Sequence, residues 1–219
     1  MKPLMSLKAG RMKKRDVKTQ YVQFDGNIIE EKDLEDEFKK WIEEWKFSES
    51  DKKLRIKNLF MHLFLRYDFD STNKQLNYVN TIGRQYQANS IMQDLDHIDA
   101  RTIDKTCAQK FFHYNLDDRR QFTNSLGNMM PLPVSINRSK HNTSASESIG
   151  LYGTQGITGW IFDETKDLFN NNKTTQIDST TKVAYDVPTE QFFKERKSRL
   201  MSYFNRIVKN QKENPDPAI

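Results

Sequence analysis

Three titratable residues stand close together in the middle of the chain, in the stretch QDLDHIDA from Gln93 to Ala100. Asp94, Asp96 and His97 alternate loosely with apolar side chains, as in a short strand. A histidine titrates near neutrality and can act as a general base, and a carboxylate oxygen is a ligand for hard cations such as Mg²⁺. This combination indicates a site that activates water beside a bound cation.

Asp96 and His97 are adjacent in sequence, and adjacent residues on a regular strand point to opposite faces. If both serve one site, the strand has to break or twist at this point. A regular, buried strand that continues through His97 would count against a shared site.

A second group of polar residues follows about thirty positions later. Residues 126–133, LGNMMPLP, are expected to form a strand that contains Asn128 and ends at its prolines. Ser135 is expected to cap a helix. Along this helix and just after it lie Asn137, Arg138, Lys140, His141 and Asn142.

A strand–strand–helix unit would bring Asp96, His97 and Asn137 to one point, and phosphodiester hydrolysis needs these groups. The histidine can deprotonate water, and one carboxylate with one amide oxygen makes a sparse Mg²⁺ site that water and phosphate complete. Asn128 can hold the histidine segment by hydrogen bonds to its backbone. The groups expected to contact nucleic acid are Arg138, Lys140, His141 and Asn142.

These motifs resemble an HNH (ββα-metal) nuclease. DLDHI followed by NSLGNMMPLPVSINRSKHN is similar to the DxDHI start and N…NRxKxN finish of the HNH domain of CRISPR effector nucleases, with the same spacing of nine between the two asparagines. The chain also resembles the nuclease domain of GmrSD-type modification-dependent restriction proteins. The resemblance covers roughly residues 52–210, but the specific motifs lie only in 91–142.

The resemblance implies a role for each of these residues. It makes His97 the general base, Asp96 and Asn137 the metal ligands, and Asn128 the structural asparagine. Asp94 is outside this set: it is either a carboxylate that orients the site, which we favour, or a solvated strand residue. The implied cofactor is Mg²⁺ or Mn²⁺, the implied substrate is DNA, and the implied setting is restriction or phage defence. GmrSD-type proteins usually carry an NTPase-like domain that is absent here, so we expect a separate subunit, a stand-alone nuclease or a fragment. The chain could bind a partner protein, either an NTPase-like subunit or a recognition subunit, and it could also form a homodimer.

Composition limits the other classes of protein. Charged residues make up 30% and the mean hydropathy is −0.85, but 36% hydrophobic residues with 14 Phe and 3 Trp indicate a folded core. The single cysteine, Cys107, predicts that the chain has no disulfide framework and no structural zinc site. No apolar run reaches membrane-spanning length, so we expect a cytoplasmic protein that does not associate with a membrane.

Positive charge gathers at the N-terminus. Residues 1–20 contain seven Lys or Arg and one acid, a net +6 of the chain's +5, so residues 21–219 sum to −1. The last helix is also basic, with Lys194, Arg196, Lys197, Arg199, Arg206 and Lys209. Basic segments of this kind often contact phosphates. Both are equally consistent with a basic surface that faces only solvent.

The expected fold is α+β and mainly helical, with a small ββα-metal (HNH) motif embedded among α-helices. Its expected parts are a basic arm 1–29, a helical region 30–90, an HNH core 91–145 with an insertion 99–123, and a loop with a C-terminal basic helix 146–219. Periodicity predicts helices over 30–47, 51–67 and 188–210, and a short helix is expected over 160–170. A weak pattern suggests a hairpin in 17–29, and connections are expected over 68–90, 143–159 and 172–182.

Two other functions fit the same sequence. A non-catalytic nucleic-acid-binding subunit would keep the shape of the motif and depend on a partner. An all-helical adaptor would instead bind a protein through Trp41 and Trp45, although at helical spacing such residues are more often core. Among the remaining residues, His113 is a candidate substrate contact and Asp99 is expected to lie in a loop.

Overall fold

The protein is described by a computed structural model. It describes residues 21–24, 27–45, 50–70, 72, 75–78, 94–103, 105–112, 116–155, 157 and 159–213. Residues 1–20 of the predicted basic arm 1–29 lie outside the described residues, and so does the candidate His113.

The fold is α+β and mainly helical, as predicted. In chain order its elements are β1 Tyr21–Phe24, β2 Asn27–Glu30, η1 Glu31–Asp33, α1 Leu34–Glu44, α2 Ser50–Arg66, β3 Tyr67–Asp70, β4 Gln75–Tyr78, β5 Asp94–His97, η2 Lys105–Lys110, α4 Leu116–Thr123, η3 Leu126–Asn128, β6 Met129–Leu132, α5 Val134–Lys140, α6 Ala145–Thr154, α7 Trp160–Asn171, β7 Lys173–Ile177, β8 Ala184–Pro188 and α8 Glu190–Glu213. In the described part of the chain the strands form four antiparallel pairs, β1–β2, β3–β4, β5–β6 and β7–β8.

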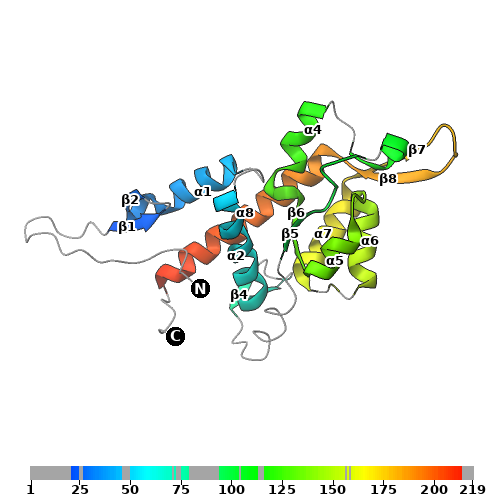
Figure 1. Cartoon of the computed structure of the whole chain (residues 1–219). Coiled ribbons are helices and arrows are strands. Elements are labelled where there is room, and N and C mark those ends of the chain that lie inside the picture. The colour runs from blue at the N-terminus through cyan, green and yellow to red at the C-terminus, as the bar shows by residue number, and fades with distance from the viewer. Residues whose placement is uncertain are drawn as a thin grey trace, which may run out of the picture.

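The long helix α8 organises the core (Figure 1). It packs against α1, α2, α7 and η3. Its predicted apolar stripe of Phe193, Leu200, Phe204 and Ile207 is buried. Most of the described elements therefore rest directly or indirectly on this one helix.

The two predicted N-terminal helices are present as α1 and α2. The apolar stripe of α1 is buried, and Trp41 and Trp45 are only 6% and 2% exposed. Burial of both indoles removes the surface that the adaptor hypothesis needs. That part of the hypothesis is therefore wrong.

Residues 68–90 were expected to be a connection, but β3 and β4 form a hairpin there, and 79–93 lie outside the described residues. The hairpin forms because its apolar side chains have partners elsewhere in the core. The ring of Phe69 lies 5.7 Å from that of Trp160 and 5.6 Å from that of Tyr203. The indole of Trp160 also donates a hydrogen bond to the carbonyl of Tyr67 at 2.9 Å.

The expected loop 143–159 contains the helix α6. Ser144 caps it, because its hydroxyl accepts from the amide of Glu147 while the Glu147 carboxylate accepts from the Ser144 amide at 2.9 Å. This reciprocal pair is a capping box, which satisfies two backbone donors at the helix start. The Ser- and Gly-rich composition suggested a loop, but the spacing from Ser144 to Glu147 was the better signal.

The expected polar loop 172–182 begins with strand β7, which pairs with β8. On the exposed face Asp186 holds the pair together, because it accepts from Lys173 at 2.7 Å and from Thr175 at 3.0 Å. Threonine is favoured in strands. The polar sequence therefore specifies an exposed hairpin rather than a loop.

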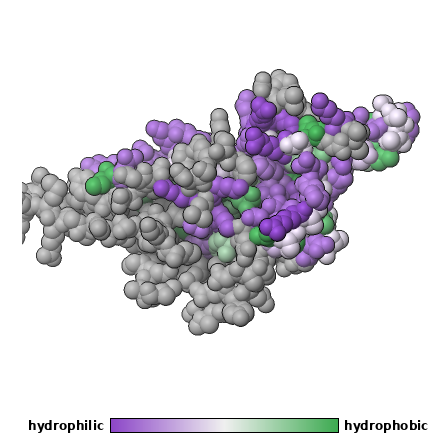
Figure 2. All heavy atoms as spheres, viewed as in Figure 1, coloured by the Kyte–Doolittle hydropathy of each residue, from purple (hydrophilic) through white to green (hydrophobic). Residues whose placement is uncertain are grey.

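The described surface is mostly hydrophilic in the view of Figure 2, with small separate apolar spots. Among the described residues the large exposed apolar side chains are Ile28, Ile177 and Val183. No helix in the described ranges is both long enough and apolar enough to cross a bilayer.

Candidate functional site

The predicted site residues lie on a strand–strand–helix unit made of β5, β6 and α5. β5 and β6 are antiparallel, with Asp96 opposite Met130 and His97 opposite Met129. The seven-residue helix α5 begins two residues after β6 and carries Asn137 and Lys140. α2 packs against both strands.

A cavity of about 240 Å³ lies at this unit. It is lined by Lys53, Leu95, Asp96, His97, Ala100, Arg101, Asn137, Lys140, His141 and Asn142. The structure thus gathers the two halves of the sequence motif, about forty residues apart, around one hollow. Asp94, Asn128 and Arg138 do not line it.

A shared site was expected to require a break in the strand between Asp96 and His97. The strand does not break there. The β5–β6 ladder continues through His97 and ends there, and the next amide, that of Ile98, donates to the carbonyl of Asn128 at 2.8 Å. Both Asp96 and His97 are nevertheless half-buried and line the cavity. The expected break or twist is therefore absent, which counts against a shared site, while the common lining of the cavity counts for it.

Asn137 is held by a carboxylate of the first strand. Its side-chain nitrogen donates to Asp94 Oδ2 at 3.1 Å. This bond directs the amide nitrogen toward Asp94 and leaves the amide oxygen as the group that Asn137 can offer to a ligand. Asp94 therefore orients Asn137 instead of being a solvated strand residue.

Lys140 is not the exposed phosphate contact that the sequence predicted. Its side chain is 1% exposed, and its ammonium lies 2.7 Å from Asp96 Oδ2 and also donates to the carbonyl of His97. The prediction took a basic residue at a helix end for a surface residue. Burial of the Lys140 ammonium is tolerated here because it forms an ion pair with a carboxylate and a hydrogen bond with a carbonyl.

Burial shifts the pKa values of both half-buried groups. It raises the pKa of Asp96, and the charge of Lys140 opposes this shift. Burial lowers the pKa of His97 to about 4. The charges of Lys140, Arg101 and Lys53 act in the same direction, while the polar side chain of Asn124 opposes them. His97 is therefore neutral at pH 7, the state that a proton acceptor requires.

Asn128 is fully buried and fixes the segment after His97. Its side-chain oxygen accepts from the amide of Asp99 at 2.8 Å, and its side-chain nitrogen donates to the carbonyls of Asp99 at 2.8 Å and Thr123 at 2.9 Å. One side chain thus ties the end of β5 to the end of α4. It acts on the backbone and does not reach the cavity.

Asp99 was expected to be a loop residue, but it is fully buried in an ion pair with Arg119 at 2.9 Å. Its carboxylate also accepts from the amides of Ala145 at 3.0 Å and Phe112 at 3.3 Å. Burial raises the pKa of Asp99, and Arg119 and the amides oppose that shift. Arg119 in turn donates to the carbonyls of Phe112 and Ala100.

Arg196 of α8 is also buried, which corrects its assignment to a solvated or nucleic-acid-facing surface. Its guanidinium donates to the carbonyls of Gly127 at 3.0 Å and Met129 at 2.7 Å, on either side of Asn128. A Cβ built on Gly127 would collide with the carbonyl of Phe193, so glycine is needed for α8 to approach this closely. The core helix thereby supports the site from behind.

The three remaining predicted nucleic-acid contacts, Arg138, His141 and Asn142, are exposed. His141 ends α5 with φ 51° and ψ −145°, a conformation that is uncommon for a residue with a side chain. It turns the chain sharply after Lys140 and places His141 and Asn142 at the cavity.

Sequence reasoning missed three residues near the histidine. Lys53 and Arg101 line the cavity, and Asn124 acts on His97 by raising its pKa. Arg101 is only four positions beyond His97 and could have been noticed from that spacing. No local pattern connects Lys53 or Asn124 with the histidine, because tertiary packing brings them there.

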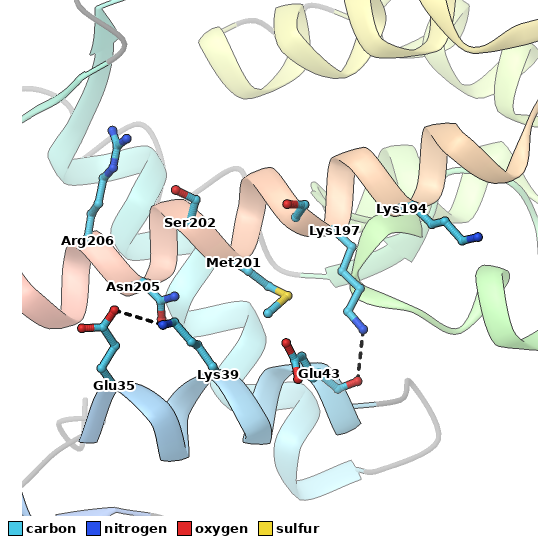
Figure 3. Close-up of a pocket in the computed structure, with 10 residues that line it drawn as sticks. Glu35, Lys39, Glu43, Lys194, Lys197, Met201, Ser202, Asn205 and Arg206 are labelled. Atoms are coloured by element: carbon cyan, nitrogen blue, oxygen red, sulfur yellow. Dashed lines mark hydrogen bonds and ion pairs between the residues drawn. The ribbon is translucent and has the colours of Figure 1, made fainter. Parts of the chain in front are cut away.

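A larger cavity of about 790 Å³ lies between α1 and α8 (Figure 3). Two of its lysines have partners within the same lining. Lys197 donates to the carbonyl of Glu43 at 3.1 Å, and Lys39 lies 3.3 Å from Glu35. None of the predicted site residues lines it, so we place the candidate site at the smaller cavity.

The donor set at the smaller cavity suits a hard cation. Asp96 and Asn137 supply oxygen atoms to one hollow, which Mg²⁺ or Mn²⁺ accepts together with water. No group of three or more His, Cys, Asp or Glu able to hold a metal occurs among the described residues. A cation held here would depend on an amide oxygen, water and substrate, and the Lys140 ammonium would have to leave Asp96.

Comparison with known proteins gives no relative: no family model, curated protein or solved structure matches this chain. The arrangement of side chains therefore carries the functional argument.

Proposed function

We propose that this protein is a metal-dependent endonuclease of the HNH (ββα-metal) type that hydrolyses phosphodiester bonds in DNA, in restriction or phage defence. The observation that carries the proposal is the meeting of Asp96, His97 and Asn137 at one cavity, from two segments about forty residues apart. The resemblance of the two segments to HNH motifs adds to it.

In the proposed mechanism His97 takes the proton from the attacking water. Its low pKa keeps it neutral at pH 7, and the negative charge of a bound phosphate would raise that pKa and strengthen the base. The fixed segment from Ile98 to Asp99 holds the imidazole in place, because Asn128 bonds to the backbone on both sides of Asp99.

Asp96 and Asn137 would hold Mg²⁺ or Mn²⁺. A bound cation supplies stabilisation of the negative charge that develops on the phosphate and the leaving oxygen. Asp94 keeps the Asn137 amide oriented through its 3.1 Å hydrogen bond. With a cation bound, Lys140 would have to leave Asp96 and would keep only its hydrogen bond to the carbonyl of His97.

The ion pair between Lys140 and Asp96 supports a second function. Lys140 already balances the charge of Asp96 in the described state, so the chain can fold around this site without a metal. We therefore keep the alternative of a nucleic-acid-binding subunit that requires a partner protein before it can cleave. The two functions differ in whether the isolated chain cuts DNA.

The test is nicking of supercoiled plasmid by the purified protein with Mg²⁺ or Mn²⁺, and with EDTA. We expect cleavage with metal, none with EDTA, and a loss of at least about a hundredfold in His97→Ala, the size of a missing general base. His62→Ala is the matched control, because His62 lies on α2 with its ring 5.7 Å from that of Tyr67 and does not line the cavity.

Cleavage that persists in His97→Ala would overturn the assigned mechanism. A folded protein that binds DNA but cuts with neither metal would support the partner-dependent subunit instead.

A further inference from the structure

His141 has an unusual backbone conformation at the end of α5. Its φ is 51° and its ψ is −145°, and among the described residues Lys182 is the other non-glycine residue with a positive φ. A Cβ makes a positive φ unfavourable, whereas glycine adopts it without strain. Strained residues of this kind are concentrated at functional sites, where the surrounding structure holds them in place.

His141 and Lys182 differ in what explains the positive φ. Lys182 lies in the connection between β7 and β8, and its amide donates to the carbonyl of Asp178 at 2.9 Å. Connections between antiparallel strands commonly contain a residue with a positive φ, so hairpin geometry accounts for Lys182. His141 follows a helix, where glycine is the usual residue with a positive φ. The bend at the end of α5 therefore explains the conformation but not the presence of a histidine.

Two contacts hold the segment around His141 beside the end of β5. Before it, the ammonium of Lys140 donates to the carbonyl of His97. After it, the carbonyl of Thr143 accepts from the amide of Ala100 at 3.1 Å. His141 thus lies between two points that are tied to the strand end and the turn after it, and it lines the same cavity as His97.

The imidazole of His141 is accessible to a ligand in the cavity. The residue is exposed, and its side chain takes part in none of the hydrogen bonds or ion pairs formed between described residues. Phosphodiester hydrolysis needs a base that takes a proton from water and an acid that gives a proton to the leaving oxygen. Ammonium and guanidinium groups hold their protons too tightly for the second task near neutral pH, whereas a histidine suits it.

We propose that His141 is the general acid of the phosphodiester hydrolysis and protonates the leaving oxygen while His97 deprotonates the attacking water. This role rests on the proposed function, because it needs a phosphodiester in the cavity. The water oxygen bonds to phosphorus as one proton of the water passes to His97. The bond from phosphorus to the leaving oxygen breaks, and that oxygen takes a proton from the His141 imidazolium. Exchange with solvent then restores both histidines.

The test compares two leaving groups in one DNA duplex, with Mn²⁺ throughout. A bridging sulfur replaces the leaving oxygen at the linkages that the wild type cuts in the unmodified duplex. A thiolate leaves without being protonated, so the loss of a general acid should slow only the oxygen linkage. For His141→Gln we expect cleavage of the oxygen linkage to fall by about a hundredfold or more and cleavage of the sulfur linkage to stay close to that of the wild type.

His97→Ala is the contrasting variant, because the loss of the base should slow cleavage of both linkages. A His141→Gln protein that cuts both linkages equally slowly would overturn the proposal. Affinity for the unmodified duplex in EDTA, measured by fluorescence anisotropy, separates proton transfer from binding. The wild type and His141→Gln should bind equally, and a fall in affinity as large as the fall in rate would make His141 a binding residue and overturn its role as an acid.

Glycine at position 141 separates a catalytic role from a structural one. His141→Gly should cut the oxygen linkage as slowly as His141→Gln but melt at a temperature no lower than that of the wild type, because glycine adopts a positive φ without strain. Lys182→Gly is the matched control, since it relieves a positive φ outside the cavity and should cut DNA as fast as the wild type. A His141→Gly protein that also cuts as fast as the wild type would overturn the proposal.

Failure of the general acid and failure of the nuclease give different results. A wild type that cuts the oxygen linkage no faster than His141→Gln, while both outpace His97→Ala, keeps the nuclease and removes the general acid. A folded wild type that cuts neither linkage overturns the proposed function and the general acid together.

Discussion

Two aspartates three positions apart form ion pairs of the same kind in different surroundings. Asp99 pairs with Arg119 inside the fold, where both side chains are at most 2% exposed and the carboxylate also accepts two backbone amides. Asp96 pairs with Lys140, but this pair opens onto the cavity and the Asp96 side chain is 14% exposed. The first pair has no room for another ligand, and the second does.

The difference teaches how one short segment serves both folding and chemistry. A buried ion pair whose remaining hydrogen bonds are all supplied by backbone holds a single geometry. A pair beside a hollow can exchange its cation for another. We therefore assign the structural role to Asp99 and the exchangeable role to Asp96, although Asp96 lies in β5 and Asp99 only two residues beyond its end.

The largest expected effect comes from opening the closed pair. Arg119→Met leaves the Asp99 carboxylate buried without its cation, which should lower the free energy of unfolding by about 3–5 kcal/mol. Urea denaturation followed by circular dichroism measures it. Arg120→Met is the matched control, because Arg120 is exposed on the same helix. A loss no greater than that of Arg120→Met would contradict the structural role.

Breaking the Asp96–Lys140 pair at the cavity should lower the free energy of unfolding by less than breaking the Asp99–Arg119 pair. In Lys140→Met, Asp96 can take up water or a proton through the cavity, so we expect the free energy of unfolding to fall by about 1–3 kcal/mol. Mn²⁺ should then raise the melting temperature of Lys140→Met more than that of the wild type, because the metal no longer competes with the ammonium. Equal metal responses in the two proteins would show that Lys140 and the metal do not share Asp96.

The smallest effect is a pH dependence confined to the cavity side. The pKa of His97 is about 4 in the folded protein and near 6.5 when unfolded, so between these values the unfolded chain binds more protons. Stability is therefore fully present above pH 6.5 and falls as the pH is lowered toward 4. Since His97 is only half-buried, we expect a loss of about 1–2 kcal/mol relative to His97→Gln.

Urea denaturation at pH 7 and pH 4.5 in both proteins measures that difference. The wild type should lose more stability than His97→Gln between the two pH values. His62→Gln provides the matched control and should behave as the wild type. A wild type that loses no more stability than His97→Gln would contradict the lowered pKa.

Strong periodicity was the reliable part of the sequence. The helices α1, α2 and α8 were predicted because their apolar side chains recur at helical spacing, and these side chains are buried in one core. The short helix expected over 160–170 is present as α7. The short polar elements were not predicted, since β7 and the β3–β4 hairpin depend on cross-strand pairing that local composition does not reveal. The capped start of α6 was readable at Ser144 and Glu147 but was masked by its loop-like composition.

For the candidate site, the sequence predicted that three residues would come together, and it misjudged the surroundings of others. It brought Asp96, His97 and Asn137 together correctly, since the structure lines one cavity with all three. It could not tell that Lys140 and Arg196 are buried, because each is stabilised by partners far away in sequence. The identity of a basic residue alone does not show whether its side chain is paired inside the fold or exposed to solvent.

The position of Asp99 also bears on how the chain folds. Its side chain and backbone bond to residues 13, 29 and 46 positions further along, at Phe112, Asn128 and Ala145. These contacts close long loops, so they form only after most of the chain has collapsed, and α6 lacks its Asp99 contact until then. The histidine end of β5 should thus become ordered late and cooperatively. Partly folded chains would then lack an assembled cavity, which limits the proposed DNA cleavage to molecules that have completed folding.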